Sequence, residues 1–410
     1  MLDRIWAFFF LAAAAAGLVQ AVFLGRSDVF PAMIGALFDA AKTGFEISLG
    51  LTGVMALWLG FMRLGERGGA VDLLARLFGP LLRRLFPSIP VGHPAAGSIV
   101  MNMAANVLGL DNAATPLGLK AMRELQELNP HPDTASDDQI LFLVINTSSV
   151  TLLPVTIFTY RAQLGAADPT DVFLPILIAT FCSTMAGLLI TAAVQRRRLL
   201  ADPVVAGWLG GLTLLVVGLV AWLGSMEREA LQARSALAAN LLLMSVIAAF
   251  LVAALRHRVP VYETFVEGAK EGFQVAVGII PYLVGMLAGI AVLRASGALD
   301  MALDGIRHAT AVVGADGRWI DALPTALMKP LSGSGARGMM VEAMQTFGAD
   351  SFVGRLVSVM QGSTETTFYV LAVYFGSVGI RRTRHAAACG LAADAVGLVA
   401  AILVAYLFFG

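Results

Sequence analysis

The chain has 410 residues, of which 58% are hydrophobic and 14% are charged, and its formal net charge is zero. Soluble domains carry about 25% charged residues, so this composition excludes an ordinary soluble protein and indicates an all-α, polytopic membrane protein. A neutral chain gives no reason to expect a nucleic-acid partner. The two cysteines lie in apolar stretches and indicate neither a disulfide framework nor a metal site.

Seven apolar runs recur along the chain, at residues 5–24, 47–61, 172–194, 204–223, 236–255, 275–293 and 386–409. A membrane-spanning helix needs about 20 residues, and somewhat fewer where packing allows. The first run follows a short charged segment, as in a signal peptide. Because it continues to residue 24, we expect it to be retained as a helix.

The two halves of the sequence resemble each other. AKTGFEISLG at 41–50 matches AKEGFQVAVG at 269–278, an offset of 269 − 41 = 228, and VINTSSVT at 144–151 lies against VMQGSTET at 359–366. Such self-similarity predicts a duplicated membrane unit. We expect a first half at 1–200, two linking helices at 201–260 and a second half at 261–410.

Charge distribution predicts that the two copies are inverted. Basic clusters occur at 196–198, 256–258 and 381–385, and positive charge gathers in cytoplasmic loops. With all three clusters in the cytoplasm, the last helices of the two copies point in opposite directions. Inverted repeats with broken helices are a frequent plan among secondary transporters.

Each copy follows the same coarse order: a short amphipathic helix, a span, a second amphipathic helix, a polar broken segment, an interrupted helix and a closing span. In the first copy the second amphipathic piece is VDLLARLFGPLLRRLF, at 71–86. Its arginines and leucines fall on separate faces at helical spacing, so we expect it to lie along the membrane surface.

The first polar stretch, MNMAANVLGLDNAATPLGLK, predicts the tip and arms of a re-entrant hairpin. Asn112 and Thr115 follow a glycine-containing break and are expected to contact a substrate, and Pro116 suits the first turn of a new helix. Asn102 and Asn106 share a helical face. They either join the site or bond to neighbouring helices, as polar residues in membrane bundles do.

The second polar stretch, NTSSVT, lies inside an apolar run and predicts a helix broken within the membrane. Asn146, Thr147, Ser148 and Ser149 would line the site from this break. The alternative is that the hydroxyls bond back to the preceding helical turn without any ligand.

The third stretch, QGSTETT, is the repeat partner of the second and predicts a second break. Gln361, Ser363 and Thr364 are expected to bind substrate, and Glu365 is the candidate for coupling to a proton or a sodium ion. An ionisable group at membrane depth costs a few kcal/mol and therefore suggests function. A structural ion pair with Arg337 is the alternative.

The fourth stretch, KPLSGSGARG, predicts a glycine-rich turn that opens a helix. Such a turn offers unpaired backbone N–H groups to an anion. Ser332 and Ser334 would line the site, Arg337 would clamp an anionic or carbonyl group, and Lys329 would add a second charge. The alternative is a tight turn that lets two helix tips pack closely. No strand precedes the glycines, so a dinucleotide fold is rejected.

These motifs carry a family resemblance. ANVLGLDNAATPLGLKAM with INTSSVTLLP resembles spore maturation protein A, and KPLSGSGARG with QGSTETTFYVLAVYFGSVGI resembles spore maturation protein B, joined here end to end over nearly the whole chain. Both belong to the group with the nucleoside-recognition, or Gate, domain, which is similar to parts of concentrative nucleoside transporters and ferrous-iron permeases. The resemblance implies re-entrant hairpins and broken helices at these positions.

We therefore expect a secondary transporter of a small polar or anionic solute, nucleoside-like or carboxylate, in the bacterial inner membrane. Its expected partners are the solute, a proton or sodium ion and the lipid bilayer, and the surface-lying helices would allow a homo-oligomer. A non-transporting receptor or scaffold is the alternative. An enzyme is not expected, because no nucleophile–base pair, metal cluster or nucleotide loop is visible, and no cofactor is implied.

Overall fold

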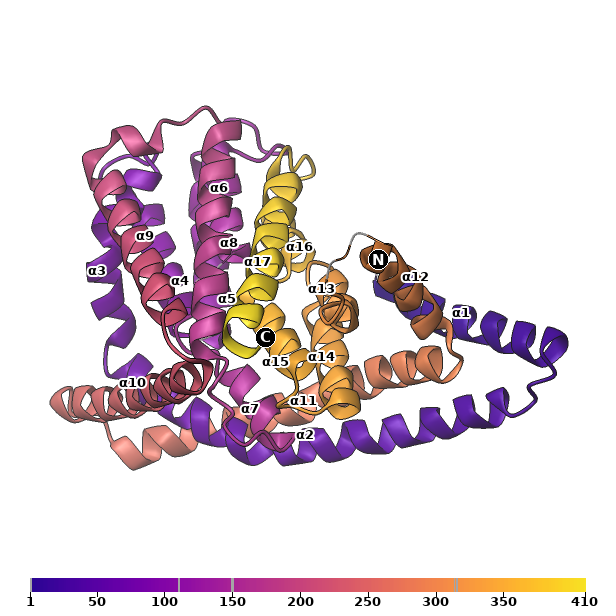
Figure 1. Ribbon diagram of the computed structural model, residues 1–410. Coiled ribbons are helices and arrows are strands. Elements are labelled where there is room, and N and C mark those ends of the chain that lie inside the picture. The colour runs from indigo at the N-terminus through magenta and orange to yellow at the C-terminus, as the bar shows by residue number, and fades with distance from the viewer. Residues whose placement is uncertain (1, 110, 149–150, 313, 315) are drawn as a thin grey trace.

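The computed structural model describes residues 2–109, 111–148, 151–312, 314 and 316–410 (Figure 1). This part of the chain is mostly helical, with one isolated β-bridge between Thr134 and Arg382. The predicted all-α class is confirmed.

The helices of the first half are α1 (Leu2–Phe23), α2 (Val29–Arg67), α3 (Ala70–Leu85), α4 (Pro94–Leu108), α5 (Asp111–Glu127), α6 (Asp137–Thr147), α7 (Val155–Gln163) and α8 (Phe173–Val194). The linking segment contains η1 (Leu199–Ala201), α9 (Pro203–Gly224) and α10 (Arg228–Arg256). The second half contains α11 (Val261–Ala295), α12 (Ala298–Val312), η2 (Ile320–Ala322), α13 (Leu323–Met328), α14 (Gly333–Phe347), α15 (Phe352–Ser363), α16 (Thr367–Ser377) and α17 (Ala386–Phe409).

Among the described residues, seven helices are long and apolar enough to cross a membrane. They are α1, α2, α8, α9, α10, α11 and α17, and each contains or closely matches one of the apolar runs in the sequence. The multi-pass character is therefore confirmed.

The order of elements in α2–α8 is repeated in α11–α17: a long helix, an amphipathic helix, a helical hairpin, a broken helix and a closing helix. One expectation is wrong. The short amphipathic helix and the span that were expected separately are one helix in each half, with 39 residues in α2 and 35 in α11. Nothing between the two pieces stops the helix, and the exposed pair Lys42–Glu46 adds an i,i+4 ion pair there.

The long helices α2 and α11 run antiparallel along the lower edge of Figure 1. Glycines allow their close approach: a Cβ at Gly44 would lie 2.9 Å from Val284, and one at Gly272 would lie 2.6 Å from Ala56. The two contacts correspond, since 272 − 44 = 228 and 284 − 56 = 228. A contact that repeats itself in this way is characteristic of a twofold arrangement of like elements.

The predicted amphipathic helix at 71–86 is confirmed as α3, which continues through an internal proline. Val71, Leu81 and Leu85 face inward, whereas Arg76 and Arg83 are exposed.

Both hairpins and both breaks occur where the polar stretches predict them. The first hairpin joins α4 and α5 through Gly109, at φ 71°, and the second joins α13 and α14. The first break separates α6 from α7, and the second separates α15 from α16. Pro116 is a correction: α5 begins at Asp111, so the proline lies inside this helix and not in its first turn.

The closing helices α8 and α17 pack side by side through the centre of the bundle, and residues of both halves share the largest buried apolar cluster. The Ser183 hydroxyl donates to the Ala393 carbonyl at 3.0 Å. Gln195, just after α8, contacts His385, just before α17, at 3.3 Å. The end of α8 therefore lies beside the start of α17, and the two helices run antiparallel.

Candidate functional site

A cavity of about 130 Å³ lies where the hairpin tips meet the two breaks. The first half contributes Gly109 at its hairpin tip and residues 151 and 153–157 at its break, together with Tyr160. The second half contributes four of the side chains that were singled out in its sequence. They are Lys329, Arg337, Gln361 and Glu365.

The glycine-rich turn opens α14, as the sequence predicts. Ser332 caps α14 by accepting a hydrogen bond from the Gly335 N–H at 3.0 Å, and its hydroxyl lies 3.3 Å from that of Ser334. A Cβ at Gly333 would lie 2.8 Å from the Thr366 hydroxyl, so glycine is needed for the turn to pack against the second break. The two serines thus shape the turn, and neither lines the cavity.

Arg337 lies one turn into α14, where its Nε donates to the Gly333 carbonyl at 3.3 Å. This bond holds the side chain along the turn, and the residue also lines the cavity wall. Its positive charge acts on the buried phenol of Tyr160 from the other half. The Tyr160 hydroxyl has no hydrogen-bond partner among the described groups.

Gln361 and Glu365 line the same cavity from the second break. The Gln361 side-chain oxygen is buried and lacks a partner in the described part of the chain, so it is available to a donor on a solute. Glu365 is exposed to the cavity, and within the described residues no ion pair joins it to Arg337. The alternative of a structural Glu365–Arg337 ion pair is therefore not what this structure contains.

The remaining side chains of the two breaks point elsewhere. Thr147 and Ser148 both donate to the Val144 carbonyl, at 3.0 and 2.8 Å, and Ser363 donates to the Met360 carbonyl at 2.9 Å. Thr364 is buried against α17. The hydroxyls of Thr147, Ser148 and Ser363 thus bond back to their own helix, and none of the four residues lines the cavity.

Asn146 and Asn106 bond to each other across two helices, at 2.8 Å, and Asn102 donates to the Ala114 carbonyl at 2.7 Å. This pattern favours the helix–helix alternative for Asn102 and Asn106. Thr115 is half-buried on α5 and has a polar interaction of its own.

Two predicted residues cannot be placed. Ser149 lies outside the described residues, and so does the side chain of Asn112. Their assignment to the site stays a prediction.

Backbone hydrogen bonds tie each break to the hairpin of its own half. The Leu152 N–H donates to the Val107 carbonyl at 2.8 Å, and the Phe368 N–H donates to the Pro330 carbonyl at 3.0 Å. A further bond crosses between the halves, from the Glu365 N–H to the Thr147 carbonyl at 2.6 Å. The cavity wall is therefore assembled from breaks that hold one another in place.

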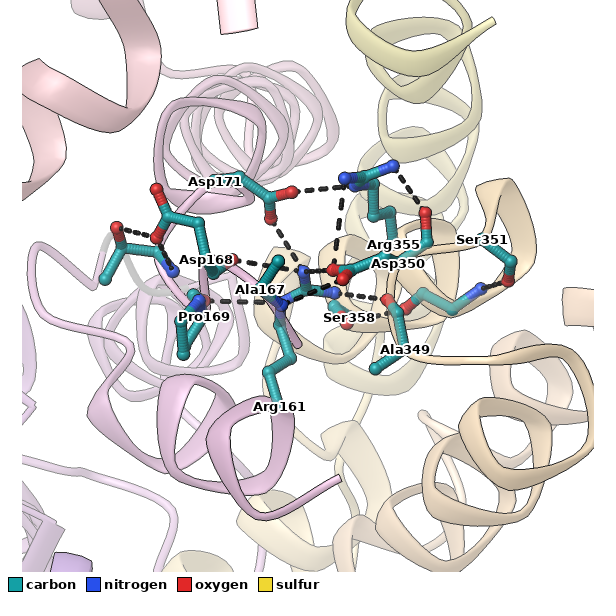
Figure 2. Close-up of polar contacts among 12 residues, drawn as sticks. Arg161, Ala167, Asp168, Pro169, Asp171, Ala349, Asp350, Ser351, Arg355 and Ser358 are labelled. Carbon is teal, nitrogen blue, oxygen red and sulfur yellow. Dashed lines mark hydrogen bonds and ion pairs between the residues drawn. The ribbon is translucent and has the colours of Figure 1, made fainter. Parts of the chain in front are cut away.

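A buried charge network that was not predicted from the sequence joins the halves at one end of the bundle (Figure 2). Arg161 is 0% exposed and donates to Asp171 at 2.8 Å, to Asp350 at 3.1 Å and to the Ala349 carbonyl at 2.7 Å. Arg355 donates to the second oxygen of Asp171 at 2.7 Å. Arg161 and Asp171 come from the first half, whereas Asp350 and Arg355 come from the second.

Burial dominates the electrostatics of this network. It raises the pKa of Asp171 above its ordinary value, against the opposing effect of Arg161 and Arg355, and it lowers the pKa of Arg161. The only hint in the sequence was an arginine close to an aspartate that directly precedes a span.

A second, more exposed set of ion pairs joins the halves at the other end of α8. Arg384 pairs with Asp137 at 2.8 Å, and Arg382 with Asp133 at 3.6 Å, with arginine side chains 42% and 75% exposed. The 22 residues of α8 separate the two sets by about 33 Å, close to the thickness of a bilayer core.

Asp394 was also missed, because it lies within the apolar run at 386–409. It is 1% exposed and accepts a hydrogen bond from Thr367 at 2.7 Å. Among the described residues, no group of three or more His, Cys, Asp or Glu side chains is placed to hold a metal ion.

Comparisons with known proteins agree with this arrangement. The family model described as nucleoside recognition (Gate) matches residues 48–164 and 276–381. The chain is 50% identical to spore maturation protein B of Bacillus subtilis (strain 168) over 165 residues, which is 40% of this chain and 91% of that protein. It is 42% identical to spore maturation protein A of the same organism over 163 residues, which is 40% of this chain and 83% of that protein. No solved structure matches.

Proposed function

This chain belongs to the nucleoside-recognition (Gate) family, and from that premise we propose that it is a secondary transporter of a small polar or anionic solute, acting in the bacterial inner membrane. The observation that carries the proposal is the cavity that both halves share at their broken helices. Broken helices near the middle of a membrane protein are where secondary transporters bind substrates and coupling ions.

The chemistry of the cavity suits an anion or a carbonyl group. Arg337 would clamp it, since a guanidinium presents its donors in a planar fork, and Lys329 adds a second positive charge on the same wall. The Gln361 oxygen would accept a hydrogen bond from a hydroxyl or amino group of the solute. Glu365 is the candidate for coupling to a proton or sodium ion.

The size of the cavity favours a small solute. The cavity measures about 130 Å³. Sites for drug-sized ligands measure roughly 300–1,000 Å³. A short carboxylate therefore fits the cavity as it stands, whereas a whole nucleoside would require the breaks to move apart.

The antiparallel α2–α11 and α8–α17 pairs support an inverted repeat, with the cavity at the interface of the two copies. The charge sets at the two ends of α8 would then act as opposing gates. The Arg161 network is buried and would close its end, and the more exposed Arg384 and Arg382 pairs would open first. Alternating access requires such a difference between the two ends.

A non-transporting receptor or scaffold of the spore maturation type would use the same cavity, and we place it second. The family model describes recognition, which both functions share. The two differ in whether a bound solute crosses the membrane.

Ligand binding is tested first by a thermal-shift screen of the detergent-purified protein against nucleosides, nucleobases, amino acids and dicarboxylates. A ligand that binds only the native state raises its stability by mass action. Arg337→Ala should abolish the shift, and Arg26→Ala should retain it because Arg26 is 60% exposed and does not line the cavity. No shift with any class, or an equal shift in Arg337→Ala, would contradict the proposed site.

A further inference from the structure

A second polar site lies where α17 crosses the break between α15 and α16. Gly390, Asp394 and Gly397 recur every three or four residues and so share one face of α17. A Cβ at Gly390 would lie 2.8 Å from Thr367, and one at Gly397 would lie 2.7 Å from Thr364. The two glycines thus let the break pack directly on the helix, with Asp394 between them.

The carboxylate in this contact is only partly satisfied. Its Oδ2 accepts a hydrogen bond from Thr367 at 2.7 Å, but its Oδ1 is buried without a partner among the described groups. Thr364 is 3% exposed, and its buried hydroxyl lies near the same carboxylate and likewise has no hydrogen bond of good geometry among the described groups. A carboxylate with one described hydrogen bond and no ion pair among the described residues therefore lies in the interior, beside a hydroxyl that can either donate or accept a hydrogen bond.

A buried carboxylate with an unpaired oxygen is costly when it is ionised, because the low-dielectric interior does not replace its hydration. A proton on Oδ1 would remove the buried charge, and the Thr364 hydroxyl can accept a hydrogen bond from the resulting acid O–H.

The surroundings favour a proton over a metal cation. A metal cation would have to bind beside an existing positive charge. The charged groups that act most on Asp394 are Lys329 and Glu365, and Lys329 already supplies a positive charge. The neighbouring side chains from α8 and α6 are Ser183 and Thr147, which are uncharged.

We infer that Asp394, with Thr364 and Thr367, is a proton-binding site of this protein, in which the carboxylate takes up one proton from solvent and the resulting acid O–H donates a hydrogen bond to Thr364. The first half has a neutral counterpart. Thr184 precedes Gly187 by three residues, as Asp394 precedes Gly397, and Thr184 donates to the Ser148 carbonyl at the other break. The titratable group is therefore confined to the second break.

The site stands whether or not the cavity carries a solute. Because Lys329 both lines the cavity and acts on Asp394, protonation would change the charge presented to a solute. This last consequence rests on the proposed transport function.

Infrared spectroscopy of the full-length protein in detergent, without added solute, tests the site through the C=O stretch of a protonated carboxylic acid. Wild type should show a band that disappears as the pH rises. Asp394→Asn should lack it, and Asp39→Asn, at an exposed acid on α2, should retain it. A titrating band that is unchanged in Asp394→Asn would overturn the inference.

Thermal unfolding provides a second readout. If the native state holds one proton that the unfolded chain releases, the ratio of folded to unfolded protein falls up to tenfold per pH unit as the pH rises, and this slope is lost in Asp394→Asn. A midpoint that rises with Na⁺ relative to choline in wild type but not in Asp394→Asn would identify a sodium site and overturn the proton assignment. Should Asp394→Asn fail to fold, Asp394→Glu must show the band at a shifted frequency, and an unshifted band would refute the site.

Discussion

Replacing Arg161 with methionine tests how strongly the buried charge network holds the two halves together. Arg161→Met keeps much of the side-chain volume but removes the hydrogen bonds to Asp171, Asp350 and the Ala349 carbonyl. Removing one partner of a buried ion pair costs about 3–5 kcal/mol, because the other charge is left uncompensated. Arg355 still pairs with Asp171, so we expect the lower end of this range.

Arg384→Met is the matched control at the other end of α8. Its side chain is 42% exposed and its ion pair with Asp137 is accessible to water, so we expect a loss of about 0–1 kcal/mol. Unfolding of both variants and wild type in detergent, followed by tryptophan fluorescence, gives the comparison. Equal losses of unfolding free energy in Arg161→Met and Arg384→Met would refute the argument that a buried ion pair is more costly to break than an exposed one.

Acidification should partly rescue Arg161→Met. Burial already raises the pKa of Asp171, and Arg161 is the largest opposing influence, so its removal raises this pKa further. An acid with a raised native pKa holds a proton that the unfolded chain releases, and stability is lost as the pH rises through that window. The loss of unfolding free energy in Arg161→Met relative to wild type should therefore be smaller near pH 5 than near pH 8. A loss of unfolding free energy that is independent of pH would contradict this explanation in terms of the Asp171 pKa.

Three further predictions address other regions. Gly272→Ala should lose about 1–3 kcal/mol of stability through overpacking against α2. Gly278 lies on the same helix with open space around it, so Gly278→Ala should be neutral or gain up to about 1 kcal/mol. Equal thermal midpoints of the two variants would refute the close approach of α2 and α11 at Gly272. Glu365→Gln should abolish the ion dependence of flux, and a variant whose uptake still follows the proton or sodium gradient would exclude that coupling role. Burial and Arg384 lower the pKa of His385, so stability should fall as the pH drops below about 6.5; His385→Gln should flatten this slope in pH-dependent unfolding, and an unchanged slope would rule the histidine out.

The hairpins and breaks could be predicted from the sequence because their causes are local. Glycine, proline and clustered hydroxyl residues interrupt a helix wherever they occur, and the turns at Gly109 and Gly333 formed where expected. The continuity of α2 was not predicted, because an amphipathic segment followed by an apolar segment suggests two separate helices. The sequence contains no positive signal that a single helix runs through both segments.

The contacts that individual side chains make could not be predicted, because they depend on neighbours that are distant in sequence. Thr147 and Arg337 looked equally suited to a site, yet only Arg337 lines the cavity. Arg161 pairs with Asp350, 189 residues away, and no local pattern marks that contact. Asp394 was overlooked for a related reason, since one carboxylate barely alters the hydropathy of a long apolar run.

Uptake by proteoliposomes tests the central claim of transport most directly. Radiolabelled succinate and uridine serve as the carboxylate and nucleoside probes, with Arg337→Ala and Arg26→Ala alongside wild type. The account predicts that at least one probe accumulates above protein-free vesicles, that Arg337→Ala abolishes this uptake and that Arg26→Ala retains it. A probe that shifts the thermal midpoint in an Arg337-dependent way but never enters the vesicles would contradict transport and establish a receptor or scaffold.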